Sequence, residues 1–142
     1  ADGEFRINIV DADGPELRLD AAGNLTIDGT LSQGSDRARK SGIVPVDGAE
    51  ILAKVRSLPV AEWSWQGGAD TRHIGPMAQD FHAIFGTGAD TTRIGVLDAS
   101  GVALAAIQEL AARTDRLAAR TDALEAENAA LRALFHGAAT AD

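Results

Sequence analysis

The sequence predicts an α+β fold in three parts: an N-terminal β-hairpin or meander, a small central α+β domain, and a long C-terminal helix that forms a parallel coiled coil. Short apolar alternations broken by turn residues fill the first quarter of the 142-residue chain. The middle mixes a helical apolar pattern with an alternating run, and the last third is heptad-patterned. We place these parts at residues 1–34, 35–98 and 99–136, and we expect a disordered tail over 137–142.

The N-terminal part is predicted to be a hairpin or meander. In LRLDAAGNLTIDG, apolar residues alternate with polar ones on both sides of the turn residues Gly23 and Asn24. A β-sheet this small, with one apolar and one polar face, cannot bury its apolar face by itself. We therefore expect these strands to pair with another chain or with a longer β-rich body upstream.

The central part begins with a helical pattern over 46–58, in which Asp47 is the N-cap and Pro59 ends the helix. A short strand is expected over 60–65, followed by a loop. A second helix is predicted to open near Pro76, because proline is tolerated in the first helical turn.

The last third carries the most regular pattern. Residues spaced alternately by three and four occupy the a and d positions of successive heptads, with leucine at every d position from Leu110 to Leu131. We call these residues the seam: Ile107, Leu110, Thr114, Leu117, Thr121, Leu124, Asn128, Leu131 and Phe135. A stripe this narrow is typical of a coiled coil, and the alternative is a lone amphipathic helix packed on its own domain.

Charged residues beside the seam favour a parallel arrangement. In a parallel coiled coil, Arg120 would pair with Glu125 and Glu127 with Arg132 between the g and e positions of neighbouring helices. Antiparallel helices gain no such match of opposite charges. Three polar residues at a positions cost stability but fix the register. They do not by themselves choose between a dimer and a trimer.

The composition excludes several classes of function. Thirteen Lys and Arg against 21 Asp and Glu give a net charge of -8, which repels nucleic-acid backbones. The absence of cysteine excludes disulfides and thiolate chemistry. No apolar run approaches the length of a membrane span. We therefore expect neither a nucleic-acid nor a membrane partner.

One stretch, LSQGSDRARK, could carry chemistry. A serine hydroxyl is a poor nucleophile without a base, and lysine replaces histidine in Ser-Lys systems. Lys40 lies five residues after Ser35, and Gly34 leaves the preceding carbonyl unhindered. A lysine acts as a base only where burial or nearby positive charge lowers its pKa, and Arg37 and Arg39 would supply such charge if they folded inward. By spacing alone, a solvated polar turn is the competing interpretation.

Other site classes lack their motifs. His73 and His82 are nine residues apart without a carboxylate at a metal-ligand spacing, so we expect no metal site. No nucleotide-binding glycine motif occurs, and we expect no cofactor.

Three blocks in order carry a resemblance to a known family: SDRARKSGIVPVDGAEILAKVRSLPVAEWSW, then RHIGPMAQDFHAIFG, then IGVLDASGVALAAIQEL leading into the coiled coil. Together they resemble the C-terminal intramolecular chaperone domain of phage endosialidases and tailspikes, also called the peptidase S74 family. The resemblance covers Ser35 to about Leu131.

The resemblance implies a self-cleaving chaperone. Members of the family lie at the C-terminus of trimeric β-rich fibre or spike proteins, assist their folding, and cut the peptide bond before the serine of an SD-x-x-x-K motif. Here that motif implies Ser35 as nucleophile, Lys40 as general base in a Ser-Lys dyad, and Asp36 as a residue that positions the turn. The scissile bond would join Gly34 to Ser35. The RHIG block implies a supporting, scaffold role for His73.

The resemblance also implies partners and a place. The chain would form a homotrimer and act once as a serine endopeptidase, in cis or within the trimer. Residues 1–34 would be the end of a β-rich passenger. The protein would belong to a virion tail fibre or spike assembled in the bacterial host cytoplasm. A non-cleaving trimerisation tip that stays attached to the fibre is the alternative, and a hydrolase of outside substrates is a weaker one.

Overall fold

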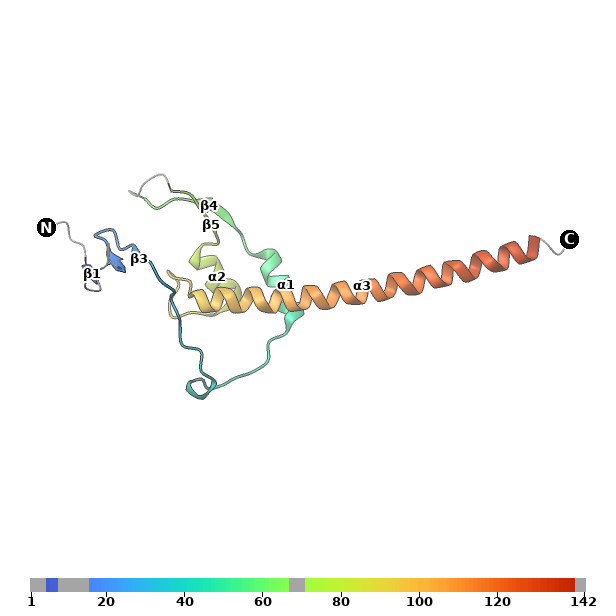
Figure 1. Ribbon diagram of the computed structural model, residues 1–142, viewed down its shortest axis with the longest axis horizontal. Coiled ribbons are helices and arrows are strands. Elements are labelled where there is room, and N and C mark those ends of the chain that lie inside the picture. The colour runs from blue at the N-terminus through green and yellow to red at the C-terminus, as the bar shows by residue number, and fades with distance from the viewer. Residues whose placement is uncertain (1–4, 8–15, 67–70, 140–142) are drawn as a thin grey trace. The chain divides into compact units, whose positions relative to one another are not determined.

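The chain is α+β, with two small antiparallel sheets and a long C-terminal helix, as the sequence predicts (Figure 1). The computed structural model describes residues 5–7, 16–66 and 71–139. The chain divides into two compact units, which are Ala1–Val44 with Ser64–Thr71, and Pro45–Trp63 with Arg72–Asp142.

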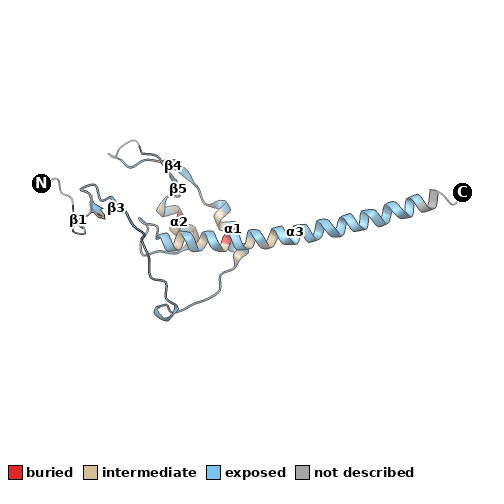
Figure 2. Ribbon diagram, in the orientation of Figure 1, coloured by how far each residue is buried: buried red, intermediate tan, exposed pale blue. Residues whose placement is uncertain are grey.

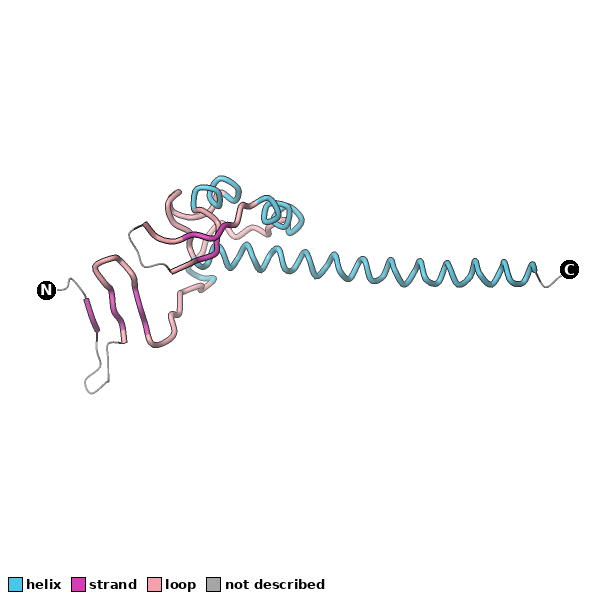
Figure 3. The backbone as a smooth tube through the Cα atoms, turned by 90° about the horizontal axis from the view of Figure 1, so that it is seen from above, coloured by secondary structure: helices cyan, strands magenta, loops and turns pink. Residues whose placement is uncertain are grey.

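The first unit contains a three-stranded antiparallel sheet in the order β1-β2-β3, and its strands appear in magenta in Figure 3. The strands are β1 (Phe5–Ile7), β2 (Leu17–Leu19) and β3 (Leu25–Ile27). In the turn between β2 and β3, the Asp20 carboxylate accepts hydrogen bonds from the N–H groups of Ala22 and Asn24, and Gly23 has a φ of 87°. That φ favours glycine. The predicted hairpin is confirmed.

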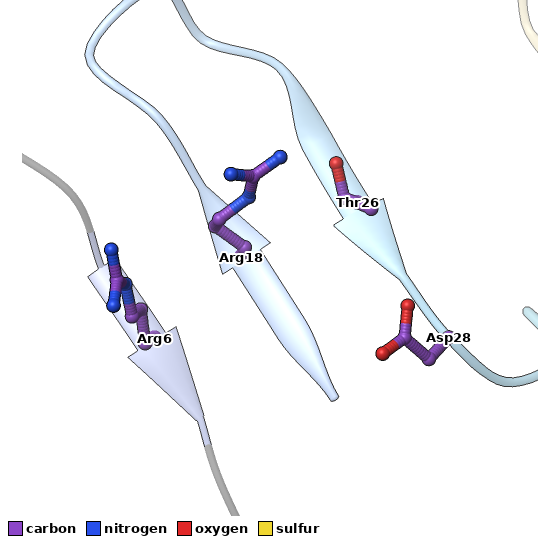
Figure 4. A pocket seen from close by; sticks show the side chains of 4 residues that line it. All are labelled: Arg6, Arg18, Thr26 and Asp28. Carbon is purple, nitrogen blue, oxygen red and sulfur yellow. The ribbon is translucent and has the colours of Figure 1, made fainter. Parts of the chain in front are cut away.

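The register gives this sheet two different faces. Directly opposed residues share a face, and the apolar sheet face consists of Phe5, Ile7, Leu17, Leu19, Leu25 and Ile27. Arg6, Arg18 and Thr26 line the other face beside Asp28 (Figure 4). Phe5 exposes 58% and Leu25 56% of its surface. The single chain therefore leaves much of the apolar sheet face in water.

The second unit begins with α1 (Gly48–Ser57). The Asp47 carboxylate accepts hydrogen bonds from the N–H groups of Ala49 at 2.8 Å and Glu50 at 3.2 Å. These bonds satisfy donors that have no partner within the helix. Asp47 is therefore the N-cap that the sequence predicts.

A two-stranded sheet follows, and it corrects part of the sequence prediction. Strand β4 (Ala61–Trp63) pairs with β5 (His73–Gly75), although the sequence predicted a single strand here and a helix opening near Pro76. Helix α2 (Ala78–Phe85) begins two residues after that proline. The residue before a proline is biased toward extended backbone, so Gly75 ends a strand rather than entering a helix.

The loop between α2 and α3 is organised around Asp90. Its carboxylate accepts hydrogen bonds from the Thr92 hydroxyl and N–H, both at 2.7 Å, and from the Arg93 guanidinium at 2.6 Å. The Thr92 hydroxyl, the Thr92 N–H and the guanidinium lower the pKa of Asp90 to about 2. This loop leads into the last helix.

Helix α3 (Val96–Ala139) packs against α1 near its N-terminal end, and its remainder extends beyond α1 (Figure 1). It begins three residues before the predicted start at 99 and continues past 136, so 137–139 are helical rather than disordered. Residues 140–142 lie outside the described residues. No described helix is both long enough and apolar enough to span a membrane.

The two helices pack through a face of α3 that is distinct from the seam. Leu52 of α1 and Ala106 of α3 are buried, and Figure 2 colours buried residues red. The Glu109 side chain of α3 lies close to Gly48 at the start of α1. The seam leucines and Ile107 stay exposed. Packing of α3 on α1 therefore leaves the seam exposed in the single chain.

Candidate active site

A short 3₁₀ turn brings together residues that are extended on either side of it. The turn covers Arg37–Arg39 and is capped by Asp36, whose carboxylate accepts a hydrogen bond from the Ala38 N–H at 2.9 Å. The Arg39 N–H donates to the Asp36 carbonyl, and the Lys40 N–H donates to the Arg37 carbonyl. Asp36 and Lys40 on either side of the turn have extended backbone conformations.

This turn places the two predicted dyad residues in contact. The Lys40 Nζ lies 2.6 Å from the Ser35 Oγ. A general base must lie within hydrogen-bond reach of the proton that it removes, and this distance meets that condition. As an ammonium, Lys40 donates to the hydroxyl oxygen, and as a neutral amine it can accept the hydroxyl proton.

An open cleft of about 340 Å³ surrounds the pair. Its lining residues are Gly34, Ser35, Asp36, Arg39 and Lys40. The Arg39 Nη1 lies 3.9 Å from the point where a Cβ on Gly34 would stand. Of the two arginines in the turn, only Arg39 lines the cleft, and all the lining residues are exposed.

His73 belongs to the other compact unit and has the contacts of a scaffold residue. Its ring stacks on Trp63 across the β4–β5 pair, with ring centroids 4.6 Å apart and planes at 27°. Glu62 in β4 and Arg72, the residue before β5, form an exposed ion pair with 3.0 Å between Arg72 Nη2 and Glu62 Oε2. Stacking supports the sheet, whereas an exposed ion pair adds little stability.

The described side chains contain no group of three His, Asp or Glu residues placed to hold a metal ion. A hydroxyl, an amine in contact with it and a glycyl carbonyl immediately before it are the parts of a serine-type acyl transfer.

Residues 35–88 match the model of a family described as chaperone of endosialidase, Peptidase S74. The match begins at Ser35, and it includes the 3₁₀ turn, α1, β4, β5 and α2 but stops before α3. This match confirms the resemblance over residues 35–88. No curated protein matches the chain.

Sequence reasoning missed two features of this region. Strand β5 is only three residues long, and its pairing with β4 is a tertiary contact that a short window cannot contain. The second missed feature is the position of Arg39 in the cleft, which depends on the backbone conformation of the turn. The sequence signal for it was that Arg39 directly precedes Lys40 in the serine motif, where a positive charge can assist the reaction.

Proposed function

We propose that the chain is an intramolecular chaperone that trimerises a β-rich tail fibre or spike and releases itself by cutting the Gly34–Ser35 bond. The observation that carries this proposal is the 2.6 Å contact between Lys40 Nζ and Ser35 Oγ at the first residue of the family match. The family description names a chaperone of endosialidase, and its peptidase name agrees with a hydrolytic site.

The cleavage chemistry depends on the order of the atoms along the chain. Neutral Lys40 takes the Oγ proton while Oγ attacks the carbonyl carbon of Gly34, which immediately precedes Ser35. The C–N bond then breaks, and Lys40 returns the proton to the Ser35 nitrogen. The product is an ester between Gly34 and the Ser35 Oγ. Water hydrolyses it, leaving a Gly34 carboxylate, a free Ser35 amine and a restored hydroxyl.

Exposure of the seam supports association through α3. In the single chain, its polar a residues donate to carbonyls one turn back, from Thr114 to Leu110 and from Thr121 to Leu117, each at 3.0 Å. Burying these hydroxyls in a coiled coil therefore leaves no donor unpaired. The proposed assembly is a parallel homotrimer, whose g and e positions would pair opposite charges.

The apolar sheet face supports a passenger role for the residues before the cleavage site. A coiled coil that holds three chains together raises the effective concentration of their sheets. The sheets could then bury these faces against one another, which a single chain does not achieve. Cleavage would remove the template and leave an assembly that unfolds slowly. We place this assembly on a virion tail, made in the bacterial cytoplasm.

Intact-mass spectrometry of the purified protein tests the cleavage. Wild type should give fragments that end at Gly34 and begin at Ser35, and Ser35→Ala and Lys40→Met should stay whole while they still associate. Ser41→Ala is the matched control, because this serine lies next to the dyad but does not line the cleft. A cleavage rate that does not change on dilution supports reaction within one chain.

The competing role is a trimerisation tip that stays attached to its fibre. The exposed seam and the sheet would serve that role equally well. Whole wild-type chains, found under conditions where both wild type and Ser35→Ala are trimers, would favour it over self-cleavage.

A further inference from the structure

Arg39 is placed to act on the scissile peptide. It lines the same cleft as Ser35 and Lys40, and its Nη1 lies 3.9 Å from the Cβ position of Gly34. Asp36 lines the same cleft, but among the described residues no carboxylate lies within ion-pair distance of this guanidinium.

The proposed attack creates a need for such a group. When Oγ adds to the Gly34 carbonyl, the carbonyl oxygen becomes an oxyanion, which requires donors or positive charge close by. Backbone N–H groups often fill this role. Here the N–H groups of Ala38, Arg39 and Lys40 already donate to acceptors within the turn.

We propose that the Arg39 guanidinium stabilises the oxyanion that forms on Gly34, which makes Arg39 a third catalytic residue. This inference rests on the proposed self-cleavage. As Oγ donates its electron pair to the carbonyl carbon, the π pair moves to the oxygen. Lys40 takes the Oγ proton in this step and returns it to the Ser35 nitrogen when the C–N bond breaks. Arginine stays protonated in proteins, so Arg39 supplies charge and N–H donors without exchanging a proton.

Cleavage rates of full-length Arg39→Leu, followed by intact mass, test this role. Loss of an oxyanion donor lowers rates by about 10²- to 10³-fold in buried sites, and for this exposed cleft we expect a loss of roughly 10- to 100-fold. Arg37→Leu is the matched control, because it removes the same charge from the same turn outside the cleft. It should change the rate less than about 3-fold, and Arg39→Lys should fall between wild type and Arg39→Leu.

Two further measurements separate this role from a structural one. Arg39→Leu should lower the rate at every pH without moving the pH–rate profile, and it should remain as associated as wild type in light scattering.

The outcomes distinguish the two proposals. If wild type cleaves, Ser35→Ala does not, and Arg39→Leu matches wild type, then the role of Arg39 is wrong and self-cleavage stands. If Arg39→Leu moves the profile to higher pH but reaches the wild-type plateau, Arg39 acts on Lys40 and the oxyanion role is overturned. If wild type stays whole like Ser35→Ala, both proposals fail.

Discussion

Replacement of Leu117 by alanine tests whether the seam joins chains. Leu117 occupies a central d position of α3, and 64% of its surface is exposed in the single chain. Burying a leucine side chain is worth about 1.5–3 kcal/mol. The exposed share that association could still bury is then worth about 1–2 kcal/mol per chain, or about 3–6 kcal/mol for three chains. We expect the dissociation constant of the proposed trimer to rise by about 10²- to 10⁴-fold.

Sedimentation equilibrium over a range of concentrations measures this change, and Leu134→Ala provides its control. Leu134 is 71% exposed in the single chain, so its truncation removes a similar exposed leucine. It stands at a g position, however, beside the seam. An equal loss of association for both variants, or a wild-type protein that is monomeric throughout, would refute the reasoning.

Five other substitutions, at four positions, test the second unit by thermal unfolding. Asp47→Ala should cost about 1 kcal/mol, whereas Asp47→Ser should retain most of the cap. Gly48→Val should cost about 1–3 kcal/mol, because a Cβ there would stand 3.2 Å from the Glu109 Cβ; Gly101→Ala, with open space around its Cβ, should gain up to about 1 kcal/mol. Asp90 has a pKa lowered from 3.8 to about 2, so its stabilisation is present above pH 3.8 and lost as the pH falls toward 2. Asp90→Asn should therefore lower the Tm at pH 7 and have little effect near pH 2, and an equal loss at both would contradict this.

Local signals explain which elements of the fold could be predicted. The hairpin turn is encoded by Gly23 with its neighbours, and the start of α1 by the side chain of Asp47. Both depend on contacts within a few residues. Strand β5 depends instead on pairing Trp63 with His73, ten residues apart along the chain. The periodicity of apolar residues within a short window cannot reveal a pairing between residues so far apart.

The candidate site, too, could be predicted from the sequence only in part. By spacing alone, Ser35 and Lys40 were more typical of a solvated turn, and the family resemblance was needed to name them. The structure adds the 2.6 Å contact between them. It also separates Arg39 from Arg37, which sequence could not do, because a 3₁₀ turn has about three residues per turn and points successive side chains in different directions.

The position of the Gly34–Ser35 bond determines which contacts would survive the proposed cleavage. All strand pairings of the three-stranded sheet lie before this bond, and the turn that holds the dyad lies after it. Cleavage at this bond would break neither. It would, however, create a new terminal ammonium on Ser35 beside Lys40 and Arg39, and like charges in one small cleft repel. The reaction would thus consume its only substrate and leave an end that resists rejoining, so each site would act a single time.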